Sequence, residues 1–233
     1  MLALGAASCL LATPALARPV SEAVSAGSPV SEAMSNAGST YDYLMLVQQW
    51  AITECQDAFK CKAQATYFTL HGLWPEREDG TYPTSCAQGK AYDSTVMAPL
   101  LPQLNTYWPS LNGVSDSFWN HEYTKHGRCA VDAFPTQLEY FSGTLSLLST
   151  YNVSLALAKA GLFPSNTRAM NLTAIDAALK AAYGHGMAIQ CDKANRIEVI
   201  TQCVTKEHTL RDCPPTVSTK GCKGGVAILT ASQ

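Results

Sequence analysis

The sequence predicts a single α+β domain with an antiparallel β-sheet core, packed with several helices and stabilised by disulfides. Segments with strand and helix periodicity are mixed along the chain, without a βαβ rhythm or a Gly-rich nucleotide loop, and this pattern favours an antiparallel sheet. Nine cysteines, eight of them downstream of an apolar N-terminal stretch, indicate a disulfide framework. Hydrophobic residues make up 47% of the chain and charged residues 15%, a composition that excludes an intrinsically disordered protein.

The N-terminal region has the pattern of a targeting segment. Residues 1–17 are apolar and end in the A-x-A pattern of a signal-peptide cleavage site. They lack the usual leading Lys or Arg, and a buried N-terminal helix is the alternative. Residues 18–40 contain the near-repeat PVSEAVS and PVSEAMS and are expected to be a flexible leader. No apolar run is long enough to span a bilayer, so the mature protein is not expected to be integral to a membrane. Because a signal peptide is expected to precede it, the domain of residues 41–233 is expected to be secreted or vacuolar/lysosomal.

Strand patterns occur at both ends of this predicted domain. Residues 41–50 (YDYLMLVQQW) form an apolar run of strand length, expected to be buried on both faces. Residues 63–70 predict a second strand, which leads directly to His71. Further strands are predicted at 187–191, 195–204 and 226–229.

Two helices are predicted between these groups of strands. An apolar stripe within residues 137–148 indicates a helix whose core face is formed by Leu138, Phe141, Leu145 and Leu148. Thr173, with Asp176 three residues later, predicts the capped start of another helix, which Gly184 can end.

The first of two chemically dense segments is residues 118–129, FWNHEYTKHGRC. On a helix, His121 faces Lys125 and Glu122 faces His126, because each pair is four residues apart. Gly127 then offers a natural stop. A zinc hydrolase is the rival interpretation, but the H-E-x-x-H motif needs its second histidine where Lys125 stands.

The second dense segment is residues 68–76, FTLHGLWPE, in which Gly72 permits a tight approach beside His71. Two histidine sites allow one imidazole to take a proton while the other gives one. A lysine can stabilise extra negative charge between them. This set matches cleavage of a phosphodiester by an adjacent hydroxyl, and it requires no metal or cofactor.

These two segments carry a family resemblance. FTLHGLWP and HEYTKHG resemble the active-site segments of the ribonuclease T2 family, secreted endoribonucleases of α+β fold, and similarity extends over residues 41–229. The resemblance implies cleavage of single-stranded RNA, with little base specificity, through a 2′,3′-cyclic phosphate. A net charge of −2 argues against RNA binding through overall charge. We expect a monomer that uses no cofactor and does not bind membranes.

The resemblance also assigns roles to individual residues. His126 is the implied general base and His71 the general acid, while Glu122 and Lys125 stabilise the phosphorane and His121 binds phosphate. Two base sites are implied, and they consist of Trp74, Glu76 and Tyr82 in one and Phe118 and Gln48 in the other. For Trp74 and Phe118, packing in the core is the alternative.

The family pattern implies a disulfide pairing for the eight downstream cysteines. The implied pairs are Cys55–Cys61, Cys86–Cys129, Cys191–Cys222 and Cys203–Cys213, and the second would brace the end of the catalytic helix. Asn152 and Asn171 begin N-glycosylation sequons.

Two positions depart from the family pattern. Tyr123 stands where Trp is usual and should keep the aromatic packing. Arg128 stands where Thr or Ser is usual, and its charge is expected to strengthen phosphate binding or to lower the pKa of His126. A catalytically silent relative acting in storage or recognition is the alternative function. A pollen-rejection (self-incompatibility) ribonuclease is a special case, but those are commonly basic, whereas this chain has a pI near 6.2.

Overall fold

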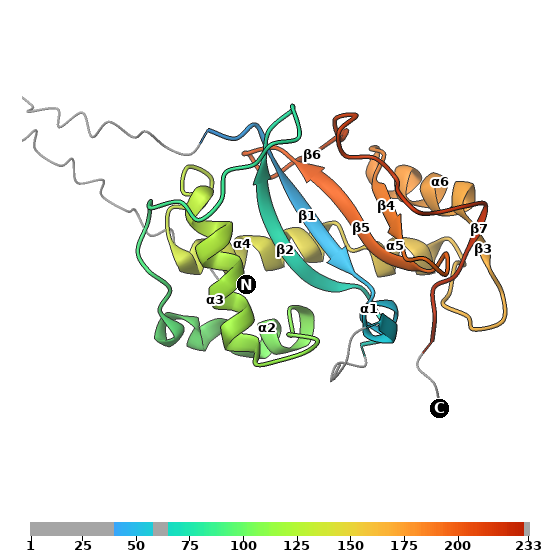
Figure 1. Ribbon diagram of the computed structural model, residues 1–233, viewed down its shortest axis with the longest axis horizontal. Helices are drawn as coiled ribbons and strands as arrows, with labels where there is room; N and C mark the ends of the chain where they lie inside the picture. The colour runs from blue at the N-terminus through green and yellow to red at the C-terminus, as the bar shows by residue number, and fades with distance from the viewer. Residues whose placement is uncertain (1–39, 58–64, 231–233) are drawn as a thin grey trace, which may run out of the picture. The chain divides into compact units, whose positions relative to one another are not determined.

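A central antiparallel sheet organises the protein, whose computed structural model describes residues 40–57 and 65–230 (Figure 1). The predicted signal peptide, all but the last residue of the predicted leader and Cys61 lie outside the described residues. The sheet has the strand order β2-β1-β5-β4, with β6 paired to β5. Its strands are β1 (Tyr43–Gln49), β2 (Thr69–Glu76), β4 (Ala188–Cys191), β5 (Ile197–Val204) and β6 (Leu210–Arg211). A second, two-stranded sheet pairs β3 (Met170–Asn171) with β7 (Gly225–Val226).

Helices lie against one face and the edges of the main sheet. They are α1 (Ala51–Asp57), α2 (Leu101–Tyr107), α3 (Ser115–Lys125), α4 (Gln137–Thr150), α5 (Val153–Lys159) and α6 (Leu172–Tyr183), with 3-10 turns η1 (Ser94–Leu100) and η2 (Gly127–Cys129). In Figure 1, α4 and α5 run behind the sheet, and α3 lies beside the edge strand β2. The predicted α+β class with an antiparallel sheet is therefore confirmed.

The core lies between the sheet and the helices behind it. Leu44 and Leu46 of β1 belong to the same buried cluster as Phe141 and Leu148 of α4. Since alternate residues of a strand point to opposite faces, Met45 of β1 points to the other face and lines a cavity there. One face of the sheet therefore builds the core. The other, the open face, carries the cavity, and on it Tyr43 and Val47 of β1 are nevertheless buried, as the sequence predicts for this strand.

Three predicted details of these elements are wrong. The second strand begins at Thr69, so His71 lies within β2 and not after it. Leu138 is 38% exposed, because α4 turns only one side toward the core. Helix α6 is capped by Asn171, whose side chain accepts a hydrogen bond from Thr173 N, so the cap lies two residues earlier than expected. The predicted stop at Gly184 is present, in the left-handed conformation with φ of 80°.

Three of the four disulfides implied by the family pattern are present in the described residues. They are Cys86–Cys129, Cys191–Cys222 and Cys203–Cys213. The fourth implied pair includes Cys61, which lies outside the described residues.

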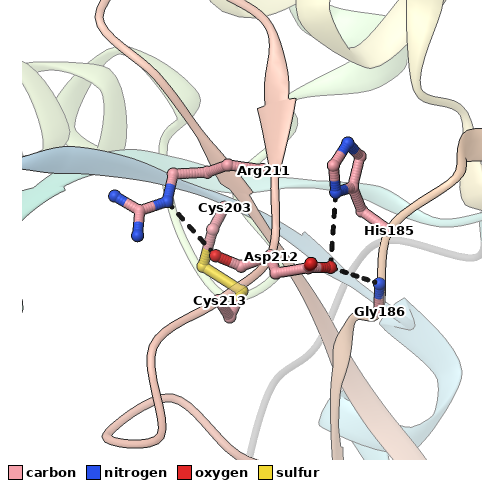
Figure 2. Close-up of polar contacts among 6 residues, drawn as sticks. All are labelled: His185, Gly186, Cys203, Arg211, Asp212 and Cys213. Carbon is pink, nitrogen blue, oxygen red and sulfur yellow. Dashed lines mark hydrogen bonds and ion pairs between the residues drawn. A yellow bond between two sulfur atoms is a disulfide. The ribbon is translucent and has the colours of Figure 1, made fainter.

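The segment that follows β6, Asp212 and Cys213, is held from two sides (Figure 2). The Cys203–Cys213 disulfide connects it to β5. Asp212 Oδ1 lies 3.3 Å from His185 Nδ1 and accepts a hydrogen bond from the Gly186 N–H at 3.2 Å. The chain that follows, residues 214–220, therefore leaves from an anchored position.

Candidate active site

The two dense segments of the sequence meet in one cavity of about 520 Å³ on the open face of the sheet. Strand β2 and the loop after it contribute one wall, and helix α3 contributes the other. The cavity residues from these two walls are His71, Trp74, Glu76, Gly80, Tyr82, His121, Glu122, Lys125 and His126. The structure thus brings together residues that are about 50 positions apart in the chain.

A β-bulge aims His71 at this cavity. Its neighbours Leu70 and Gly72 pair with consecutive residues of β1, which leaves His71 without a cross-strand partner. Such an extra residue bends a strand and redirects its side chains. As a result Leu70 and Leu73 are both fully buried in the core, although residues three apart in a regular strand point to opposite faces. The Trp108 indole N–H holds the bulge by donating to the His71 carbonyl at 2.8 Å.

Gly72 allows the two walls to touch. The Trp74 indole N–H donates to Glu122 Oε2 at 2.8 Å. A Cβ atom on Gly72 would lie 2.2 Å from each of these two atoms. This separation is too short for non-bonded atoms, so no residue with a side chain fits here without displacing Trp74 or Glu122. The tight approach expected at Gly72 is therefore the contact between β2 and α3.

Glu122 is almost fully buried, with 1% exposure. Burial raises the pKa of Glu122 from 4.5 to about 7, against the opposing effects of the Trp74 hydrogen bond and the Lys125 charge. The carboxyl group is therefore protonated in mild acid, where it does not repel a phosphate and can donate a hydrogen bond to it.

The Trp74 ring contacts both imidazoles. It stacks on His126 with centroids 5.1 Å apart and contacts His71 edge-on at 5.1 Å. Burial lowers the pKa of His71 to about 4 and that of His126 to about 3, and the nearby Lys125 and His121 charges lower both further. Among the described residues, the buried His126 Nδ1 has no hydrogen-bond partner.

The end of α3 differs from the expected glycine stop. The helix ends at Lys125, with His126 as its C-cap, and Gly127 begins the 3-10 turn η2. A Cβ atom on Gly127 would lie 2.5 Å from a Tyr123 ring carbon. Glycine is therefore required here by close packing, and not by a left-handed backbone.

Gln48 lines neither of the two cavities that contain His71, contrary to the sequence-based expectation. Its side chain is fully buried, and Nε2 donates to Gln202 Oε1 at 2.6 Å. Gln49, which the sequence analysis missed, lines a second cavity of about 180 Å³ together with His71 and Phe118. The alternation of β1 could have shown this, because Gln48 shares a face with the buried Leu46.

Arg128 also differs from expectation. Its guanidinium donates from Nε to the Gln88 carbonyl and from Nη2 to the Ala87 carbonyl, each at 2.9 Å. The residue thus secures the loop after Cys86 and does not line the catalytic cavity. Tyr123 is buried and keeps the aromatic packing expected of it.

Within residues 40–57 and 65–230, no three His, Cys, Asp or Glu side chains gather closely enough to hold a metal ion. No helix in the same part of the chain has the length and apolar character needed to cross a membrane.

Comparison with known proteins identifies the family. Residues 41–213 match the sequence pattern of the Ribonuclease T2 family. The chain belongs to this family. It is 32% identical to Ribonuclease DdI of Dictyostelium discoideum over 208 residues, covering 88% of this chain and 92% of the relative. It is therefore a T2-type endoribonuclease, with a mixed α+β architecture typical of the family.

Solved structures of T2 ribonucleases and related proteins share the fold. RNase NT in complex with 5′-AMP superposes with a TM-score of 0.73 at 28% identity, covering 81% of this chain and 98% of that one. An RNase-related protein from Calystegia sepium superposes with a TM-score of 0.71 at 32% identity, covering 81% and 97%.

Proposed function

We propose that this T2 ribonuclease cleaves single-stranded RNA by transesterification, without a metal or cofactor. The 2′-oxygen bonds to phosphorus as the bond to the 5′-oxygen breaks. His126 takes the 2′-hydroxyl proton, and His71 gives a proton to the leaving 5′-oxygen. The observation that carries the proposal is the pair of imidazoles that both contact the Trp74 ring, in one cavity with Lys125.

The remaining residues stabilise charge. The Lys125 ammonium and the protonated Glu122 carboxyl face the phosphorane, where fixed donors lower the barrier. His121 lines the same cavity on the exposed side of α3 and binds the phosphate. In a slower second step, water attacks the cyclic phosphate with the two histidine roles reversed, giving a 3′-phosphate.

The two cavities take the two bases that flank the scissile bond. His71 serves the leaving nucleotide, so that nucleotide's base lies beside Phe118 and Gln49 in the second cavity. The other base lies near Trp74, Glu76 and Tyr82. Tyr82 is 50% exposed, and stacking on it tolerates any base, which supports low base specificity.

The protein is a secreted or vacuolar/lysosomal glycoprotein in this proposal. Three disulfides in the described residues support an oxidising compartment. Asn152 and Asn171 cap α5 and α6 through their side-chain oxygens, which leaves the amide nitrogen as the atom that a glycan would modify.

Digestion of mixed-sequence RNA in the presence of a chelator tests the chemistry. We expect 2′,3′-cyclic phosphate ends, and a loss of activity of about 10²-fold to 10⁴-fold in His71→Ala and in His126→Ala. His185→Ala is the matched control, because His185 pairs with Asp212 outside the cavity. Full activity in either catalytic variant, or loss of activity with chelator, would refute the mechanism. If the protein cleaves no RNA from acidic to neutral pH, the alternative of a catalytically silent storage or recognition protein would be supported.

A further inference from the structure

The catalytic cavity extends beyond the residues that the proposed chemistry uses. It continues over the open face of the sheet, across β1, β5 and β4, to residues 216–218 and Lys220. We propose that this extension, the sheet-face arm, binds the RNA chain beyond the two nucleotides at the scissile bond, with Lys220 contacting a phosphate. This inference rests on the proposed function and specifies how a longer substrate is held.

The floor of the arm follows from strand alternation. Met45 and Val47 of β1, Val199 and Thr201 of β5 and Ala188 of β4 line it. The residues between them in sequence, such as Leu46 and Ile200, are fully buried on the opposite face, where α4 and α5 lie (Figure 1). The arm therefore has a mainly apolar floor. Met45, Val199 and Thr201 are partly exposed there, while Val47 and Ala188 are buried, and the apolar face of a base can pack on the exposed part.

Lys220 is a cation with a fixed backbone at the far wall of the arm. Its N–H donates to the Ile189 carbonyl at 2.9 Å, and its carbonyl accepts from the Cys191 N–H at 3.0 Å. The Cys191–Cys222 disulfide secures the chain two residues later. The Lys220 side chain is exposed, so its ammonium group can reach a ligand from an anchored position.

Lys220 provides the ammonium group of the arm, to which a phosphate is attracted. Lys125 and Lys220 are separate ammonium groups on one cavity, and RNA carries one phosphate per nucleotide. Glu54 and Glu198 also line the arm, and Glu198 accepts a hydrogen bond from the Gln190 amide at 3.1 Å. These carboxylates repel phosphate, so a phosphate in the arm has a favourable contact only beside the lysine, and a single phosphate contact is expected.

Two substrates separate the arm from the catalytic centre. One is a dinucleoside monophosphate, and the other is a DNA oligonucleotide with a single internal ribonucleotide, which has only one cleavable bond. For Lys220→Ala we expect KM to rise about 3-fold to 10-fold on the oligonucleotide, with kcat unchanged on both substrates. The slope of log KM against the logarithm of the salt concentration should decrease by about 0.7, the value for one phosphate contact on a single strand.

Lys223→Ala is the matched control. It removes the same charge from an exposed residue of the same segment that lies outside the cavity, and it should leave both substrates unaffected. Lys220→Arg should preserve the KM for the oligonucleotide. Three results would refute RNA binding by the sheet-face arm: an unchanged KM for the oligonucleotide in Lys220→Ala, an equal rise in KM for the dinucleotide in that variant, or an equal rise in KM in Lys223→Ala. Failure of the unaltered protein to cleave the dinucleotide would instead overturn the proposed function.

Discussion

The side chain of Glu122 shows how burial selects the protonation state of a group in the candidate active site. Its carboxyl accepts the Trp74 N–H and lies near Lys125, and both interactions favour the carboxylate. Desolvation is nevertheless the largest effect and raises the pKa to about 7. A neutral acid is the form suited to a site that receives a phosphate anion.

This protonation state predicts the behaviour of Glu122 variants. Glu122→Gln keeps an oxygen that accepts from Trp74 and an N–H that donates to the phosphorane, so activity should fall by no more than about tenfold. Glu122→Ala removes both and should lose about 10²-fold to 10³-fold in kcat. The measurement is kcat on a dinucleoside monophosphate at mildly acidic pH. Equal losses in the two variants would mean that the negative charge, and not the hydrogen bonds, is required.

The two histidines predict an acidic pH profile. The base must be neutral and the acid protonated, so kcat/KM falls below about pH 3 as His126 gains its proton, and above about pH 4 as His71 loses its proton. A bound phosphate raises both pKa values, so the profile of kcat should lie at higher pH than that of kcat/KM.

His121 provides an independent check of this profile. Its positive charge lowers the pKa of both catalytic histidines. In His121→Ala, both limbs of the kcat/KM profile should therefore move to higher pH. A neutral optimum of kcat/KM in the unaltered protein, or limbs that do not move in the variant, would contradict the assignment.

At the scale of elements, the site depends on how β2 meets α3. The bulge at His71 and the missing side chain at Gly72 let an edge strand contact the last turns of a helix. The two features have separate effects. The bulge directs the His71 side chain into the cavity, and Gly72 leaves room for the Trp74–Glu122 hydrogen bond.

Gly72→Ala tests this contact. The added methyl must displace Trp74 or Glu122, so we expect a loss of about 1–3 kcal/mol in the free energy of unfolding and a kcat reduced at least tenfold. Gly186→Ala is the control, because nothing lies within 4 Å of a Cβ atom there, and it should change neither quantity. Urea unfolding and dinucleotide cleavage measure the two effects. Normal kcat in Gly72→Ala would show that the contact is not needed for catalysis.

At the scale of the whole molecule, disulfides join distant segments. The Cys86–Cys129 bond spans 43 residues and ties the end of α3 to the loop after β2. The Cys203–Cys213 bond spans 10 residues and joins β5 to the segment after β6 (Figure 2), and neither cysteine lines the cavity that contains His71 and His126.

The two bonds should affect stability and activity differently. Chain entropy predicts losses of about 4 kcal/mol for the double variant Cys86→Ala/Cys129→Ala and about 3 kcal/mol for Cys203→Ala/Cys213→Ala. Only the first should also lower kcat, since it frees the end of the catalytic helix. Urea unfolding and dinucleotide cleavage, at a temperature where both variants are folded, provide the test. Equal kcat values would mean that the first bond serves stability alone.

The sequence by itself determined the fold class and the two segments that carry the chemistry. Both rest on local patterns: strand and helix periodicity, and a few chemical groups within about ten residues. It also placed Gly72 at a close approach, because glycine beside a histidine and a tryptophan is a local signal.

Only the tertiary structure decided the burial of Glu122 that keeps it protonated, the contacts of the Arg128 side chain, the burial of Gln48, and the extent of the cavity. The physical reason is that burial and side-chain direction arise from contacts between distant segments. Trp74 and Glu122, whose hydrogen bond connects the two walls, are 48 residues apart. Lys220 joins the same cavity only because β4 and β5 bring the C-terminal part of the chain to the open face of the sheet.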